Sequence, residues 1–169
     1  NADFAVLWEP FVSQAVDQIL GAKVVLDTTQ ARGVILDVAV ASRKTLVKEP
    51  EVIKELTKAY FRALHYYLNR PAEFEALAAA YSGESSDVAA GMLAGIRFIT
   101  LKENAEEWFG LQSGALSKLV EGIERIHKIC RDVGDLSSPP AGGSFYGLVN
   151  SDPIKASAPA KEVEAVHRY

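Results

Sequence analysis

A large aromatic side chain, Trp8, and a carboxylate, Glu9, stand together at the most informative point of this 169-residue sequence. They follow a short apolar run, Phe4–Leu7, which is typical of a buried strand, and they precede the helical pattern of residues 11–20. Ligands of open α/β sheets bind at the carboxyl ends of strands, so this point is a candidate ligand site. The alternative interpretation is structural, with Trp8 in the core and Glu9 as a first-turn acid favoured by the helix dipole.

A second carboxylate, Asp37, stands in the middle of the apolar run Val34–Ser42. A charge inside such a strand is costly to bury without a partner. Asp37 is therefore expected to face a hydrogen-bond network, a ligand cleft or solvent, and the sequence leaves these three alternatives open.

The usual sequence motifs of catalysis are absent. The sequence contains no Gly-rich phosphate loop, no Gly-x-Ser-x-Gly, no His-Glu-x-x-His and no Cys-x-x-Cys. The three histidines are far apart and show no ligand spacing, and the single cysteine, Cys130, is interpreted as a small buried apolar residue. We therefore predict no catalytic residue, no metal site and no cofactor, and a protein that is not an enzyme.

Composition sets further bounds. The hydrophobic share of 49% and the charged share of 24% are ordinary for a globular domain, and the net charge of −4 argues against a nucleic-acid partner. No apolar run reaches the roughly 18 residues that a membrane-spanning helix needs.

The elements that would position the candidate residues follow from hydrophobic periodicity. We predict about three short strands near the N-terminus, at residues 4–8, 22–27 and 34–42, with a helix at 10–20 between the first two. A run of helices follows, at 42–48, 50–68, 71–81, 88–96, 102–109 and 113–133. Residues 136–169 form a Pro/Gly/Ser-rich C-terminal tail. The fold class predicted is therefore α/β and rich in helix.

Several segments, in this order, resemble one protein family. They are Asp3–Phe11 (DFAVLWEPF), Gly33–Ser42 (GVILDVAVAS), Glu49–Lys54 (EPEVIK), Tyr60–Leu64 (YFRAL), Asn69–Pro71 (NRP) and Leu101–Gly110 (LKENAEEWFG). The chain resembles the later part of the periplasmic substrate-binding proteins of nitrate, taurine and sulfonate ABC importers, a group that includes the NMT1/THI5-like proteins. The resemblance covers about residues 2–135.

The resemblance implies a type II periplasmic-binding-protein fold, of which residues 1–135 would be the C-terminal part. About residues 1–30 would end the second lobe, and residues 31–135 would return to the first. Trp8 would stack on the ligand or wall its cleft, Glu9 would hydrogen-bond a polar or amine group, and Asp37 would be a hinge-side residue in contact with the ligand. The implied function is capture of a small organic or anionic solute for an ABC permease, in a periplasmic or extracellular protein that is lipid-anchored or soluble.

Two other functions remain open at this point: a ligand-sensing or structural module of a larger cell-envelope protein, and an enzyme resembling the thiamine-precursor synthases. The sequence begins without Met and runs directly into a predicted strand, as a piece of a longer protein or a chain whose signal peptide has been removed would do. Such a piece would leave sheet edges uncovered, so homo-oligomer formation or strand exchange is also expected.

Overall fold

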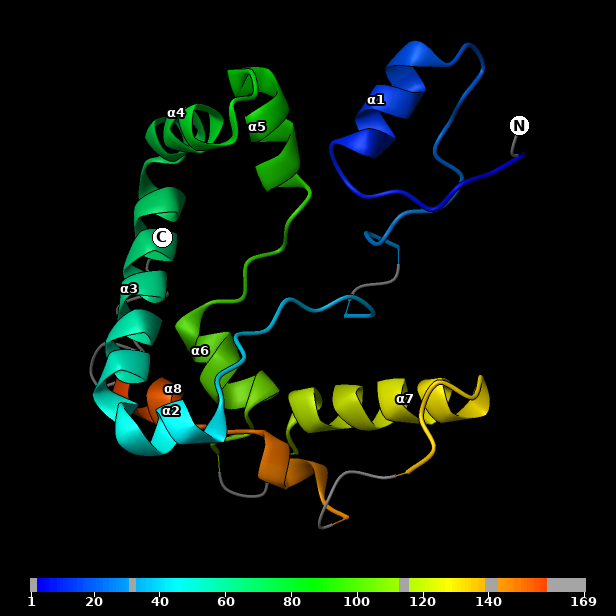
Figure 1. Ribbon diagram of the computed structural model, residues 1–169. Coiled ribbons are helices and arrows are strands. Elements are labelled where there is room, and N and C mark those ends of the chain that lie inside the picture. Colours follow the sequence, from blue (N-terminus) through cyan, green and yellow to red (C-terminus); the bar gives the residue numbers. More distant parts are fainter. Residues whose placement is uncertain (1–2, 31–32, 113–115, 139–142, 158–169) are drawn as a thin grey trace. The chain divides into compact units, whose positions relative to one another are not determined.

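The computed structural model of the protein describes residues 3–30, 33–112, 116–138 and 143–157 (Figure 1). The chain divides into two compact units. Unit 1 comprises Asn1–Leu36 and Tyr66–Arg97, and unit 2 comprises Asp37–His65 and Phe98–Tyr169. The domain boundaries that the sequence suggested, residues 1–135 and 136–169, stay predictions.

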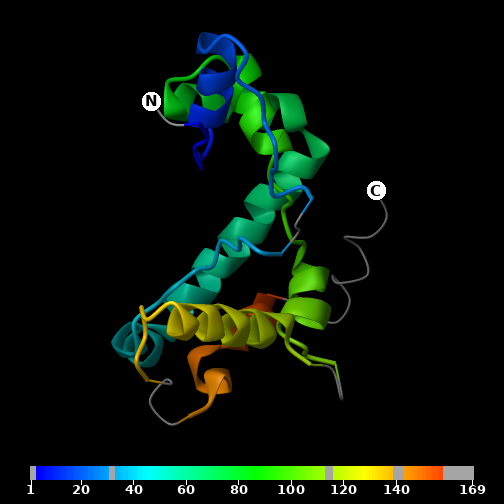
Figure 2. The same ribbon diagram turned by 90° about the vertical axis from the view of Figure 1, so that its right-hand side faces the viewer.

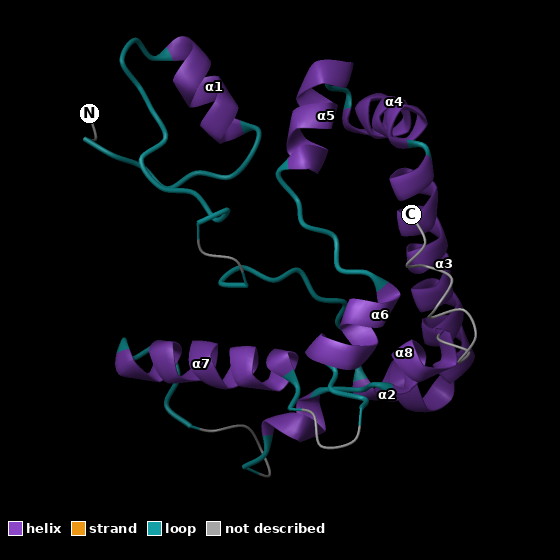
Figure 3. Cartoon of the chain, turned by 180° about the vertical axis from the view of Figure 1, so that it is seen from behind, coloured by secondary structure: helices purple, strands orange, loops and turns teal. Residues whose placement is uncertain are grey.

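The predicted α/β fold class is wrong for the part of the chain that the structure describes. That part contains helices, turns and irregular segments but no strand, as Figure 3 shows by the absence of orange. The segments predicted as strands, residues 4–8, 22–27 and 34–42, run as irregular chain.

The reason lies in their backbone groups. A strand is defined by hydrogen bonds to a neighbouring strand, whereas a helix closes its hydrogen bonds within itself. Residues 4–7 and 33–41 make no backbone–backbone hydrogen bond to another described residue. Their apolar side chains are correspondingly open to solvent, with Val6 90% and Val40 87% exposed. The apolar pattern is that of a strand, but the described chain supplies no partner for it.

Unit 1 contains the helices α1 (Phe11–Gln18), α4 (Pro71–Ser82) and α5 (Ser86–Ala94). Helices α4 and α5 pack against each other, and each has a small buried residue, Ala79 on α4 and Ala89 on α5. Gly83 ends α4 in the left-handed conformation, with φ of 76°, which glycine adopts without strain. Ser85 then caps α5 by accepting the backbone N–H of Val88.

Unit 2 contains α2 (Arg43–Lys48), most of α3 (Pro50–Asn69), α6 (Leu101–Glu103), the π-helix η1 (Asn104–Trp108), α7 (Lys118–Asp132), the 3₁₀-helix η2 (Phe145–Leu148) and α8 (Asp152–Ser157). Helix α7 contacts η1 and η2, and Figure 2 shows η2 directly beneath it. Elements α6, η1 and α8 contribute a small buried apolar cluster of Leu101, Ala105 and Ile154, against which Phe61 of α3, Phe109 and Leu111 pack.

Local signals explain why the helices of unit 2 begin where they do. Ser42 caps α2 by accepting the backbone N–H of Thr45, and Pro50 opens α3, where a missing N–H costs nothing. Thr100 and Glu103 form a capping box at α6, in which each side chain accepts the other residue's backbone N–H. Ser117 caps α7 and also donates its hydroxyl to the carbonyl of Trp108, at 2.6 Å, which joins α7 to η1.

Candidate ligand-binding residues

Trp8 and Glu9 lie on the turn that leads into α1. The carbonyl of Trp8 accepts the backbone N–H of Phe11 at 2.8 Å and that of Val12 at 3.3 Å. The first two residues of α1 therefore close the turn through their backbone hydrogen bonds. The indole of Trp8 is 65% exposed and is not buried among the described residues. Trp8 is therefore not a core residue among the described residues, and a binding role for it stays a prediction.

The carboxylate of Glu9 is oriented by Ser13, one turn further along α1. One oxygen, Oε2, accepts the hydroxyl of Ser13 at 2.9 Å and its backbone N–H at 3.3 Å. This second contact satisfies one of the free N–H groups at the start of the helix. The other oxygen, Oε1, has no hydrogen bond to a described residue, and a contact of Glu9 with a ligand stays a prediction.

Asp37 is exposed in unit 2. Partial burial and, to a smaller extent, the negative charge of Asp37 raise the pKa of the Tyr60 hydroxyl above its ordinary value. The negative charge of Asp37 therefore acts on the hydroxyl of Tyr60, which is on α3 of the same unit. Of the three alternatives for Asp37, exposure to solvent holds among the described residues, and contact with a ligand stays a prediction.

The three predicted residues divide between the two units. Trp8 and Glu9 are neighbours on one turn of unit 1, whereas Asp37 belongs to unit 2. The described part of the chain thus offers one pair of candidate residues and one separate carboxylate.

A pocket that the sequence did not suggest lies within unit 2, between the start of α3 and α8. Its volume is about 480 Å³, and it is open to solvent, because five of its nine lining residues are exposed. Apolar atoms come from Leu46, Pro50, Ile53, Pro153 and Ala156, and polar groups from Lys54, Asn150, Asp152 and Lys155.

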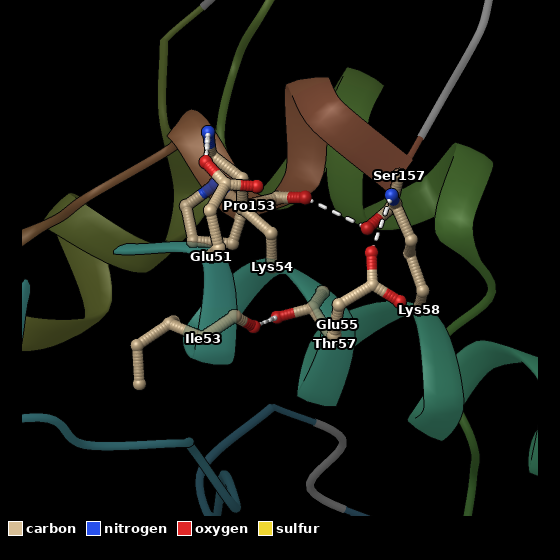
Figure 4. Close-up of polar contacts among 8 residues, drawn as sticks. All are labelled: Glu51, Ile53, Lys54, Glu55, Thr57, Lys58, Pro153 and Ser157. Atoms are coloured by element: carbon tan, nitrogen blue, oxygen red, sulfur yellow. Dashed lines mark hydrogen bonds and ion pairs between the residues drawn. The ribbon is translucent and has the colours of Figure 1, made fainter. Parts of the chain in front are cut away.

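The polar residues of this pocket make contacts with residues close to them in the sequence. Lys54 pairs with Glu51 at 2.5 Å, as Figure 4 shows. Lys155 pairs with Asp152 at 3.7 Å. Asn150 accepts the backbone N–H of Asp152 through its side-chain oxygen, at 3.0 Å. Each of the two lysines that line the pocket is thus paired with a carboxylate three residues away in the sequence.

Sequence reasoning missed this pocket because its two sides are about 100 residues apart in the chain and because the C-terminal stretch was assigned to a tail. The signal that would have found it is the short sequence Asp152–Ser157 (DPIKAS). Its Asp-Pro start favours a helix beginning there, and its Ile154 is an apolar residue that such a helix buries, at 6% exposure.

A third group of polar side chains lies in unit 1, where α3 ends and α4 begins. The hydroxyl of Tyr66 donates to Glu73, and the guanidinium of Arg70 lies 3.4 Å from the same carboxylate oxygen and 5.7 Å from the centre of the Tyr66 ring. The hydrogen bond between Tyr66 and Glu73 raises the pKa of Tyr66 and lowers the pKa of Glu73. These contacts join the end of α3 to the start of α4.

Among the described residues, no group of three or more His, Cys, Asp and Glu side chains is arranged to hold a metal ion. In the same part of the chain, no helix is both long enough and apolar enough to cross a membrane.

Comparisons with known proteins add no relative: no protein family, no curated protein and no solved structure matches the chain.

Proposed function

We propose that this chain is part of the solute-binding component of an ABC-type importer, which captures a small organic or anionic solute and delivers it to a membrane permease. Its place of action would be the periplasm or the cell exterior. The proposal rests on the ordered resemblance of the segments around Trp8, Val34–Ser42 and Trp108–Gly110. The single observation that carries it is the turn at residues 8–9, where the exposed side chain of Trp8 is next in sequence to Glu9, whose Oε1 has no hydrogen bond to a described residue.

In the proposed site, the face of the Trp8 indole stacks on the solute and excludes water from one side of it. The free oxygen Oε1 of Glu9 accepts a hydrogen bond from the solute, while Ser13 keeps the carboxylate in place. The exposure of the apolar segments 4–7 and 33–40 supports a site that further polypeptide completes, because such segments gain stability when they are covered.

The first test is native mass spectrometry of the natural protein that contains this chain, purified without refolding, to identify a co-purified solute. The second test is calorimetric titration of that solute into the Trp8→Ala variant. We expect the Kd to rise by about tenfold, because an aromatic contact and its buried area are lost.

The matched control is Trp108→Phe, which alters the other tryptophan, on η1, and should leave the Kd unchanged. Glu9→Gln tests the negative charge of Glu9 separately from its contact with Ser13, because glutamine keeps an acceptor oxygen for Ser13 but loses the charge. An unchanged Kd in Trp8→Ala would remove Trp8 from the site and return it to a structural role.

A second candidate is a ligand-sensing or structural module of a larger cell-envelope protein. It is favoured by the exposed apolar side chains of α7 and its flanks, which are Leu116, Ile126, Ile129 and Val133. The gene separates the two candidates, because an importer component has permease genes beside it and a module is fused to a kinase or a cell-wall-binding domain.

A further inference from the structure

The side chains that line the pocket between α3 and α8 offer more hydrogen-bond donors than acceptors. Each ammonium group of Lys54 and Lys155 has three N–H donors, and each has a single carboxylate partner among the described residues. Asn150 uses its oxygen for the backbone of Asp152, which leaves its amide N–H groups for another acceptor. Asp152 is the one carboxylate in the lining of this pocket.

The remaining lining of the pocket is apolar. Leu46 and Ile53 are half-buried on α2 and α3, and Pro153 is half-buried on α8. A ligand that matches this lining has an apolar body and one acceptor-rich anionic head. The head would be met by the two ammonium groups, and the body would cover side chains that water now contacts.

We propose that this pocket binds a small organic anion, such as a carboxylate or a sulfonate with a short alkyl body. The proposal does not depend on the site at Trp8, because the pocket lies wholly within unit 2 and Trp8 belongs to unit 1. The pocket would be a second binding site of the chain, with its own specificity.

The test is titration of the ¹⁵N-labelled chain, followed by amide NMR, with three probes: hexanoate, hexanesulfonate and hexylammonium. The first two share the proposed chemistry, and the third has the same body with the opposite charge. We expect the two anions to shift the amides of Ile53, Lys54 and Lys155, and to bind about tenfold more tightly than hexylammonium.

The variants Lys54→Met and Lys155→Met keep an apolar stem and remove the charge. Each should weaken hexanoate binding about fivefold, as expected for one partly exposed charge pair. Lys58→Met is the matched control, because Lys58 is also on α3, pairs with Glu55 at 2.8 Å and does not line the pocket. Circular dichroism checks that each variant keeps its helices.

The proposal is overturned if hexylammonium binds as tightly as hexanoate, if the shifted amides lie outside the pocket, or if no probe binds. It is also overturned if Lys58→Met weakens binding as much as Lys54→Met, which would indicate attraction by general surface charge. Trp8→Ala should leave the hexanoate-induced shifts of Ile53, Lys54 and Lys155 unchanged, so failure here and failure of the solute site at Trp8 are separate results.

Discussion

Residues 33–41 and the helical cluster around Leu101 are both rich in apolar side chains, yet their environments differ sharply. In the cluster, Leu101 is 8% exposed and Ile154 is 6% exposed. In the other segment, Val38 is 55% exposed and Val40 is 87% exposed. Apolar composition alone therefore does not decide whether a segment of this chain is buried.

The difference lies in how each region satisfies its backbone. The helices α6 and α7 and the π-helix η1 close hydrogen bonds within a few residues, so they form as soon as one face is covered. Residues 33–41 need a neighbouring strand, which the described chain does not provide. An apolar helix face can be buried by a few short elements, whereas an apolar strand depends on a partner of matching length.

The largest effect expected from this comparison is the loss of a buried leucine. Leu101→Ala should lower the free energy of unfolding by about 2–4 kcal/mol, because it leaves a cavity beside Ala105 and Ile154. Val38→Ala, in the exposed segment, should change it by less than about 0.5 kcal/mol. Urea denaturation followed by circular dichroism measures the free energy of unfolding of both variants. Equal losses would contradict the difference between the buried cluster and the exposed segment.

A smaller effect is expected at the start of α6. Thr100→Ala removes one half of the capping box and should cost about 1 kcal/mol of unfolding free energy. The matched control is Thr29→Ala, since Thr29 also donates its hydroxyl to a nearby carboxylate, that of Asp27, but in an exposed turn outside any helix. A control variant that lost as much stability as Thr100→Ala would show that irregular turns matter as much as helix caps.

The smallest effect is expected at the exposed corner between α3 and α4. The hydrogen bond from Tyr66 holds the pKa of Glu73 below its ordinary value of 4.5. Its contribution to stability is therefore present above pH 4.5 and is lost as the pH falls through the lowered pKa. A carboxyl-carbon NMR titration measures the pKa, which should rise toward the ordinary value in Tyr66→Phe. A pKa that stayed low in Tyr66→Phe would assign the shift to Arg70 instead.

Much of the helical part was predictable because its signals are local. Ser42, Pro50 and Pro71 mark helix starts in the sequence, and helices begin at each of these points in the structure. The π-helix η1 was predicted as part of one ordinary helix, because nothing in residues 104–108 distinguishes the two hydrogen-bond patterns. The three strands could not be judged from the sequence, since their formation depends on a partner elsewhere in the chain.

The candidate residues divide in the same way, into those that local sequence predicts and those that depend on distant parts of the chain. The turn holding Trp8 and Glu9 was predictable, because the neighbouring Pro10 and the apolar pattern of residues 11–20 indicate a helix start. The pocket at Lys54 was not, because Asn150 and Lys155 reach it only through the fold of unit 2. Local sequence can show where a helix begins, but not which distant residues it will meet.

The exposure of Asp37 has a consequence for solubility. A run of valine, isoleucine and leucine such as residues 34–40 is prone to stack with its copies in other molecules. If two copies aligned in opposite directions about their centres, the two Asp37 carboxylates would face each other and repel. We therefore expect Asp37 to oppose aggregation of this exposed apolar segment. Its replacement by asparagine should lower the concentration at which the chain precipitates.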